Sequence, residues 1–149
     1  MKSTNKLLHT LTLALLIIAS IFALLACNST VSIEKKVDKL LEDDLNSSVK
    51  ITKLYYNEEK QGCFVEFQTS TYTDKAAIHL DTGDIDYESE FDYYTEKAEK
   101  LRNQKPINQE ELHKCNEKIL NSSYPDWHFA IVVFEADGRP ENSDWERIK

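Results

Sequence analysis

Apolar residues recur along this chain with a helical period in three places. In residues 31–45 they stand at offsets 0, 4, 7, 8 and 12 from Ile33, which places them on one face of a helix with Ser32 as its N-cap. Residues 91–102 are predicted to form a second helix with a polar side rich in Glu and Lys; its apolar positions are Phe91, Tyr93, Tyr94, Ala98 and Leu101. A third helix is predicted to begin at Asn108, because Glu111 three residues later completes a capping box.

Strands are indicated where apolar and polar residues alternate. Residues 50–56 and 63–69 show this pattern and are joined by the polar turn 57–62, so they are predicted to form a hairpin. Residues 76–80 follow as a third strand, and Ile85 and Tyr87 resume a short alternation after the turn residues Asp81-Thr82-Gly83-Asp84.

Residues 127–135 form a continuous apolar run, Trp-His-Phe-Ala-Ile-Val-Val-Phe-Glu, that is rich in aromatic and β-branched types. Pro125 precedes the run and Asp137-Gly138 follows it. Such a bounded run predicts the central strand of a sheet. The remaining tail is polar, with Trp145 and Ile148 as its apolar anchors, and is predicted to be a short edge strand or a loop pinned by the indole.

These elements together predict the α+β fold class: a mainly antiparallel sheet of four or five strands with two or three helices packed on one face. Residues 32–149 are long enough for one domain with a buried core. We therefore expect a single α+β domain.

The first 26 residues have a different character. Lys2 and Lys6 precede an apolar run, and Leu24-Leu25-Ala26-Cys27 ends it, which is typical of a secretory signal peptide. An uncleaved transmembrane helix is the alternative, but the strongly apolar part is short and no basic cluster follows it.

The four residues ending at Cys27 resemble the lipobox of bacterial lipoproteins. This resemblance implies a signal peptide over residues 1–26, a lipid, such as palmitate, on Cys27, and a tether over residues 27–31. It also implies a lipid-anchored place on the cell membrane or outer membrane, facing the extracytoplasmic side. Two acyl chains would make that anchoring durable.

Residues 32–87 run helix, strand, strand, strand and end in Leu80-Asp81-Thr82-Gly83-Asp84-Ile85. This order and ending resemble the PepSY domain of secreted bacterial proteins and peptidase propeptides. The spacer that the family has between Asp81 and Thr82 is missing here. The resemblance implies a binding or inhibitory module and transfers no catalytic residue.

Charge narrows the range of partners. The chain has 18 basic and 26 acidic residues, a formal charge of −8, and without residues 1–26 it has 16 basic against 26 acidic, a charge of −10. Because the domain is this acidic, its electrostatic potential is not expected to attract nucleic acid or anionic lipid. Cationic, neutral or metal-bearing partners suit it better.

Cys63 and Cys115 are the cysteines that remain once Cys27 carries lipid. Outside the cytoplasmic membrane they can form a disulfide. Alternatively, they are two separate buried thiols that pack as small hydrophobes.

The sequence contains no recognisable catalytic motif, phosphate-binding loop or zinc spacing. Its mature histidines, His79, His113 and His128, are predicted on separate elements. Acidic residues surround two turns without the spacing of a calcium loop. We therefore expect no catalytic residue, cofactor or metal.

Tyrosines are the remaining candidates for recognition, because tyrosine is favoured at protein interfaces. Neighbouring strand residues point to opposite faces, so one of each adjacent pair is expected to be exposed unless helices cover the rings. The predicted partner surface comprises Tyr55, Tyr56, Tyr87, Tyr93 and Tyr94.

The hypothesis from sequence is a non-enzymatic cell-envelope lipoprotein that binds a protein or peptide partner, as an accessory, inhibitory or immunity-type factor. The alternatives are a solute-binding or metal-binding lipoprotein and a small envelope enzyme.

Overall fold

A computed structural model describes residues 29–138 and 143–149. The chain divides into two compact units, Met1–Lys36 and Val37–Lys149. In the first unit the described residues 29–36 are helical, so Ser32 lies inside the helix and is not its cap. A capping type at one position is therefore not enough to place the start of a helix. The predicted signal peptide and Cys27 lie outside the described residues.

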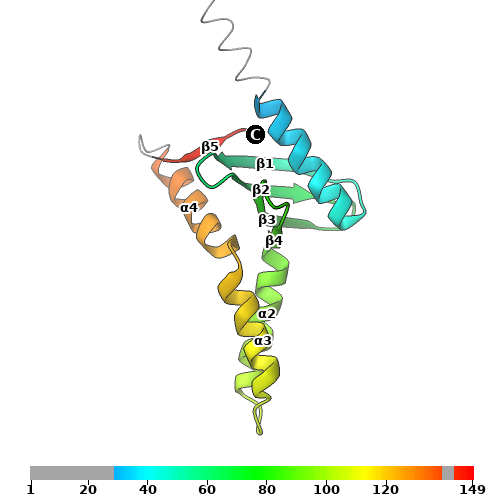
Figure 1. The fold of residues 1–149 in the computed structure, drawn as a ribbon, viewed down its shortest axis with the longest axis vertical. Coiled ribbons are helices and arrows are strands. Elements are labelled where there is room, and N and C mark those ends of the chain that lie inside the picture. The colour runs from blue at the N-terminus through cyan, green and yellow to red at the C-terminus, as the bar shows by residue number, and fades with distance from the viewer. Residues whose placement is uncertain (1–28, 139–142) are drawn as a thin grey trace, which may run out of the picture. The chain divides into compact units, whose positions relative to one another are not determined.

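The second unit is built on a five-stranded antiparallel sheet (Figure 1). Its strand order is β4-β3-β2-β1-β5, so the two central hairpins are sequential and the C-terminal strand pairs with β1 at an edge. The strands are β1 (Lys50–Asn57), β2 (Gly62–Gln68), β3 (Thr73–His79), β4 (Ile85–Tyr87) and β5 (Trp145–Arg147). The predicted hairpins and the edge strand at Trp145 are confirmed.

Four helical segments accompany the sheet in this unit. Residues 37–45 are helical and precede β1, whereas the others follow β4. They are α2 (Glu88–Arg102), α3 (Gln109–Asn121) and α4 (Tyr124–Asp137). The Asn108 side chain accepts a hydrogen bond from the Glu111 backbone N–H at 3.1 Å, which confirms the predicted cap of α3.

The core lies on both faces of the sheet. On one face Tyr55, Phe64 and Ala77 are fully buried and cluster with residues of α4. Leu54 and Val65 point to the opposite face, where residues 37–45 cross the strands (Figure 1). The predicted α+β class is therefore confirmed. In detail the helices are divided between the two faces, because the central strands are apolar on both sides.

The predicted central strand over residues 127–135 is wrong, because these residues belong to α4. Pro125 occupies the first turn, where its missing N–H costs nothing. Gly138 ends the helix in the left-handed conformation with φ 64°, and its N–H bonds back to the Phe134 carbonyl. Helix signals thus flank an apolar run whose composition alone resembles a buried strand.

No disulfide joins Cys63 to Cys115. Cys63 is fully buried in β2, whereas Cys115 is buried in α3 against Ala98 and Leu101 of α2. The two cysteines therefore belong to different parts of the core. Of the two predicted arrangements, the structure has two separate buried thiols.

Candidate functional site

The outer side of α4 carries large apolar side chains that the fold leaves in solvent. Phe129 is 70% exposed, Val132 49% and Val133 38%. Ala136 is exposed as well. Isolated exposed apolar residues are ordinary in folded proteins, but a contiguous group marks an interaction surface.

Helical spacing makes these four residues one stripe. From Phe129 they stand at offsets 0, 3, 4 and 7, which are neighbouring positions on a helix surface. We call Phe129, Val132, Val133 and Ala136 the outer stripe. The inner side of α4 is defined by its buried residues, Tyr124, Trp127, Ile131 and Phe134. A helix that is apolar on both sides is normally covered on both sides.

An open groove lies beside the outer stripe, between α2 and α4. It encloses about 410 Å³ and combines apolar walls with two carboxylates at one side. Its lining residues are Glu88, Phe91, Asp92, Tyr124, Pro125, His128, Phe129 and Val132, which we call the α2/α4 groove. The groove has room for an apolar side chain from another molecule.

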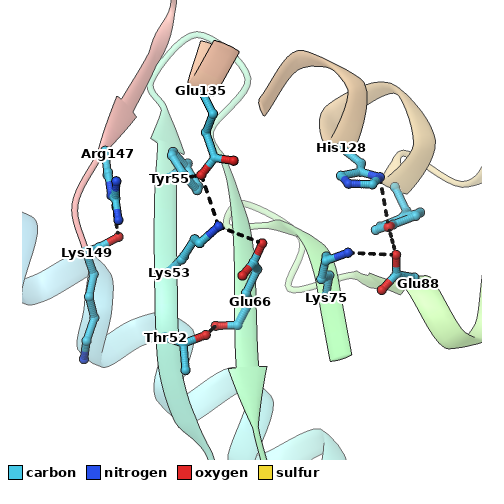
Figure 2. Close-up of polar contacts among 11 residues, drawn as sticks. Thr52, Lys53, Tyr55, Glu66, Lys75, Glu88, His128, Glu135, Arg147 and Lys149 are labelled. Carbon is cyan, nitrogen blue, oxygen red and sulfur yellow. Dashed lines mark hydrogen bonds and ion pairs between the residues drawn. The ribbon is translucent and has the colours of Figure 1, made fainter. Parts of the chain in front are cut away.

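A hydrogen-bonded network fixes the floor of this groove (Figure 2). Lys75 Nζ lies 3.1 Å from Glu88 Oε1, and the Tyr124 hydroxyl donates to the same carboxylate oxygen. His128 Nδ1 lies 3.1 Å from the Tyr124 hydroxyl oxygen. The His128 ring is stacked on Phe64 of β2, with 5.7 Å between ring centroids. The groove is thereby anchored to the sheet.

Protonation in this network follows from burial and hydrogen bonding. Burial works to raise the pKa of Glu88, but hydrogen bonds from Tyr124 and Lys75 outweigh it and lower that pKa below its ordinary value. Burial, and then the hydrogen bond to Glu88, raises the pKa of the Tyr124 hydroxyl well above 10. Glu88 is therefore a carboxylate and Tyr124 a neutral donor at neutral pH.

A second polar cluster holds the other end of α4 (Figure 2). Lys53 Nζ lies 3.2 Å from Glu135 Oε1 and 3.3 Å from Glu66 Oε1, and the Tyr55 hydroxyl donates to Glu135. The hydrogen bond with Glu135 raises the pKa of Lys53, and that from Tyr55 lowers the pKa of Glu135. These contacts join β1 to the last turn of α4.

A separate cavity of about 400 Å³ lies by the β3–β4 turn, α2 and α3 and is rich in carboxylates. There His79 Nε2 lies 2.9 Å from Ser123 Oγ and 3.9 Å from Asp86 Oδ2. Both contacts use the same ring nitrogen, and Asp86 accepts the Ser123 backbone N–H at 2.8 Å. A nucleophilic triad needs serine and carboxylate on opposite nitrogens of the imidazole, so this trio lacks that geometry.

Among the described residues, no three His, Cys, Asp or Glu side chains converge with metal-binding geometry. The described helices also include none that is long and apolar enough to cross a bilayer.

The structure brings only some of the five predicted recognition tyrosines together. Tyr55 is buried beneath α4, while Tyr56 is half-buried in β1. Tyr87 and Tyr94 line the acidic cavity, and the Tyr87 hydroxyl donates to Asp44 at 2.8 Å. Tyr93 is 57% exposed. Tyr87 and Tyr94 thus share one cavity and the Tyr93 ring lies 5.2 Å from that of Tyr94, whereas Tyr55 belongs to the core.

The outer stripe is not among the predicted sites, because a strand over residues 127–135 would have no outer helical side. Its signal is present in the sequence, since two interleaved helical stripes, one starting at Tyr124 and one at Phe129, run through the same segment. A continuous apolar run is compatible with a helix as well as with a strand, so the flanking Pro125 and Gly138 carry the distinction.

No protein-family model, curated protein or solved structure matches this chain. The element order implied by the PepSY resemblance, a helix followed by three strands, is present from residue 29 to His79. Membership of that family stays a prediction.

Proposed function

We propose that this chain is a lipid-anchored, non-enzymatic lipoprotein of the bacterial cell envelope whose outer stripe binds a protein or peptide partner. The observation that carries the proposal is the exposure of Phe129, Val132 and Val133 on a helix whose inner side is already buried. Leaving such a stripe in water promotes association, and binding removes it from water.

The geometry of the α2/α4 groove supports the same function. Its apolar walls supply affinity for a partner. The fixed Glu88 carboxylate and Tyr124 hydroxyl can orient that partner through hydrogen bonds, as polar groups commonly do in binding sites. Tyr124 is hydrogen-bonded to Glu88 and to His128, and both rings are stacked on Phe64 of the sheet, so the site is organised before any partner arrives. Such preorganisation reduces the entropic cost of association.

Photocrosslinking in the native host tests the partner proposal. A photoreactive amino acid at position 129 should give a discrete adduct, whereas the same group at Lys114, an exposed residue of α3, should give none. A second substitution, Val133→Ser, should weaken the adduct at position 129 without unfolding the protein. Equal adducts at positions 129 and 114, or none at either, contradict the proposal.

The anchor is supported by Leu24-Leu25-Ala26-Cys27 and is tested separately. Mass analysis of the N-terminal peptide should find Cys27 as the first residue with an acyl-bearing group on its sulfur. The Cys27→Ser variant should lose that group and leave the detergent-rich phase. A Ser variant that still enters membranes completely and unprocessed would contradict lipidation and favour an uncleaved helix.

A further inference from the structure

The outer stripe has the spacing of a surface that receives a helix. Its residues stand at i, i+3, i+4 and i+7 from Phe129, and the α2/α4 groove runs beside them. Helix-in-groove recognition uses these same offsets, since the side chains of one helix settle between those of the other. An extended peptide would instead need an open sheet edge, which α4 does not provide.

The acidic residues of α4 are not matched by any Lys or Arg on the same helix. The helix α4 contains Asp126, Glu135 and Asp137 but no Lys or Arg. From α2, Glu88 and Asp92 line the groove. These carboxylates surround an apolar stripe, so the surface as a whole is amphipathic and acidic.

Some of these carboxylates are already neutralised within the fold. Glu88 is paired with Lys75, and Glu135 is paired with Lys53. In the part of the chain that the structure describes, Asp92, Asp126 and Asp137 are exposed and form no ion pair with Lys, Arg or His. Within the described residues, Asp92 and Asp126 are therefore left for a cation from outside.

Charge complementarity therefore separates the possible occupants. A second copy of the chain packed α4 to α4 would bring aspartates against aspartates, and like charges across an interface are unfavourable. An anionic bilayer surface would be repelled for the same reason. A basic amphipathic helix places leucine-like side chains on the stripe and Lys or Arg beside the free aspartates.

We infer that the partner segment bound by the outer stripe is a basic amphipathic helix, an inference that rests on the proposed function. Its apolar face covers Phe129, Val132 and Val133, and one side chain enters the α2/α4 groove. Its cationic side chains lie against Asp92 and Asp126. The acidic surface thus selects partners by charge, while the apolar stripe supplies most of the affinity.

Designed peptides test this inference with the full chain. Three helical peptides share one apolar face and differ only in carrying Lys, Gln or Glu at the flanking positions. Calorimetric titration should find that the Lys peptide binds most tightly, that the Gln peptide is about threefold to tenfold weaker, and that the Glu peptide is weaker still. Raising the salt concentration should weaken the binding of the Lys peptide but not that of the other two.

Matched variants locate the binding. Asp126→Asn and Asp92→Asn should each reduce the preference for Lys over Gln, whereas Glu99→Gln, a neutralisation on α2 outside the groove, should leave it unchanged. Phe129→Ser should reduce the affinity for the Lys peptide and for the Gln peptide by a similar factor. Circular dichroism of each variant confirms that the fold is kept.

Three outcomes overturn the inference. The first is equal binding of the Lys, Gln and Glu peptides, which rejects the charge preference but leaves the proposed function standing if Phe129→Ser still weakens them. The second is concentration-dependent dimerisation in sedimentation that Phe129→Ser abolishes, which makes a second copy the occupant. The third is flotation of the unlipidated chain with phosphatidylcholine vesicles that depends on Phe129, which makes a bilayer the occupant.

Discussion

The Tyr55 hydroxyl donates a hydrogen bond to the Glu135 carboxylate, joining the middle of β1 to the last turn of α4. Lys53 pairs with the same carboxylate from the same strand at 3.2 Å. Glu135 is therefore the residue through which the sheet holds the C-terminal end of the helix that carries the outer stripe.

The Glu135→Gln variant should be less stable than the wild type at neutral pH, by less than about 1 kcal/mol because the pair is partly exposed. The Glu135 pKa is lowered in the folded state from its ordinary 4.5, so the unfolded chain takes up the proton first. The stabilisation is complete above pH 4.5 and is lost as pH falls through the folded pKa. Urea unfolding of both proteins from pH 7 downward should show the difference shrinking; a difference that persists in strong acid contradicts it.

Alkaline titration should show that three tyrosines resist ionisation in the folded protein. Burial raises the pKa of Tyr55, Tyr87 and Tyr124 well above 10, and the neighbouring carboxylates Glu135, Asp44 and Glu88 reinforce this. The folded state favours the neutral hydroxyls. Their contribution to the free energy of unfolding is therefore fully present below pH 10 and is lost as pH rises above 10. Tyrosinate absorbance should show these three rings ionising late or together with unfolding. Ionisation of all three rings near pH 10 in protein that is still folded would refute the assignment.

The two sides of α4 should respond differently to truncation. Ile131→Ala empties space in the core beside Phe134 and should cost about 2 to 5 kcal/mol of unfolding free energy. Val132→Ala, one position further along, should change it by less than about 1 kcal/mol, because Val132 is half exposed and alanine favours helix. Guanidinium denaturation of both variants measures the contrast. Similar losses would mean that the outer stripe is part of the core.

Gly62 allows the Trp127 ring to lie directly on β2. A Cβ added at Gly62 would stand 2.2 Å from Trp127 Cη2, closer than any real contact. Gly62→Ala should therefore cost about 1 to 3 kcal/mol through overpacking. In the double variant with Trp127→Phe the smaller ring leaves space for the methyl, so the two losses should sum to more than the measured loss. Simple additivity in the denaturation data would show that the ring moves away freely.

Thiol labelling tests the separation of the two buried cysteines. In the native protein, Cys63 and Cys115 should react slowly with a soluble thiol reagent, because both side chains are almost wholly buried. After unfolding without reductant, both should react completely, since no disulfide joins them. The protein purified from its native host is the appropriate sample. A mass that shifts by two hydrogens on reduction would show that the bond forms there.

Local signals predicted most of the sheet and one helix start. The alternation in residues 50–56 and 63–69 identified β1 and β2 because strands with a regular inside and outside carry a period of two. Asn108 and Glu111 identified the start of α3, because a capping box depends only on hydrogen bonds among four consecutive residues. In contrast, α2 begins at Glu88, three residues before the predicted start, directly after β4.

The candidate site was harder to predict because it depends on tertiary packing. Tyr55 and Tyr56 have the same local pattern, yet only Tyr55 lies beneath α4. The choice between strand and helix for residues 127–135 depends on Pro125 and Gly138 at the ends more than on the apolar run itself. Once the run is a helix, its inner and outer residues follow from their spacing.

A helix that is apolar on two sides has no amphipathic preference of its own for either, so its rotation about its axis must be set by other contacts. For α4 these are the Tyr124–Glu88 bond at the first turn, the Glu135–Tyr55 bond at the last, and Trp127 over Gly62 between them. One residue corresponds to a turn of about 100°. Without these contacts the helix could roll and exchange Ile131 for a residue of the outer stripe at little cost in buried apolar area. The angular setting of a single helix thus determines which apolar surface this protein presents.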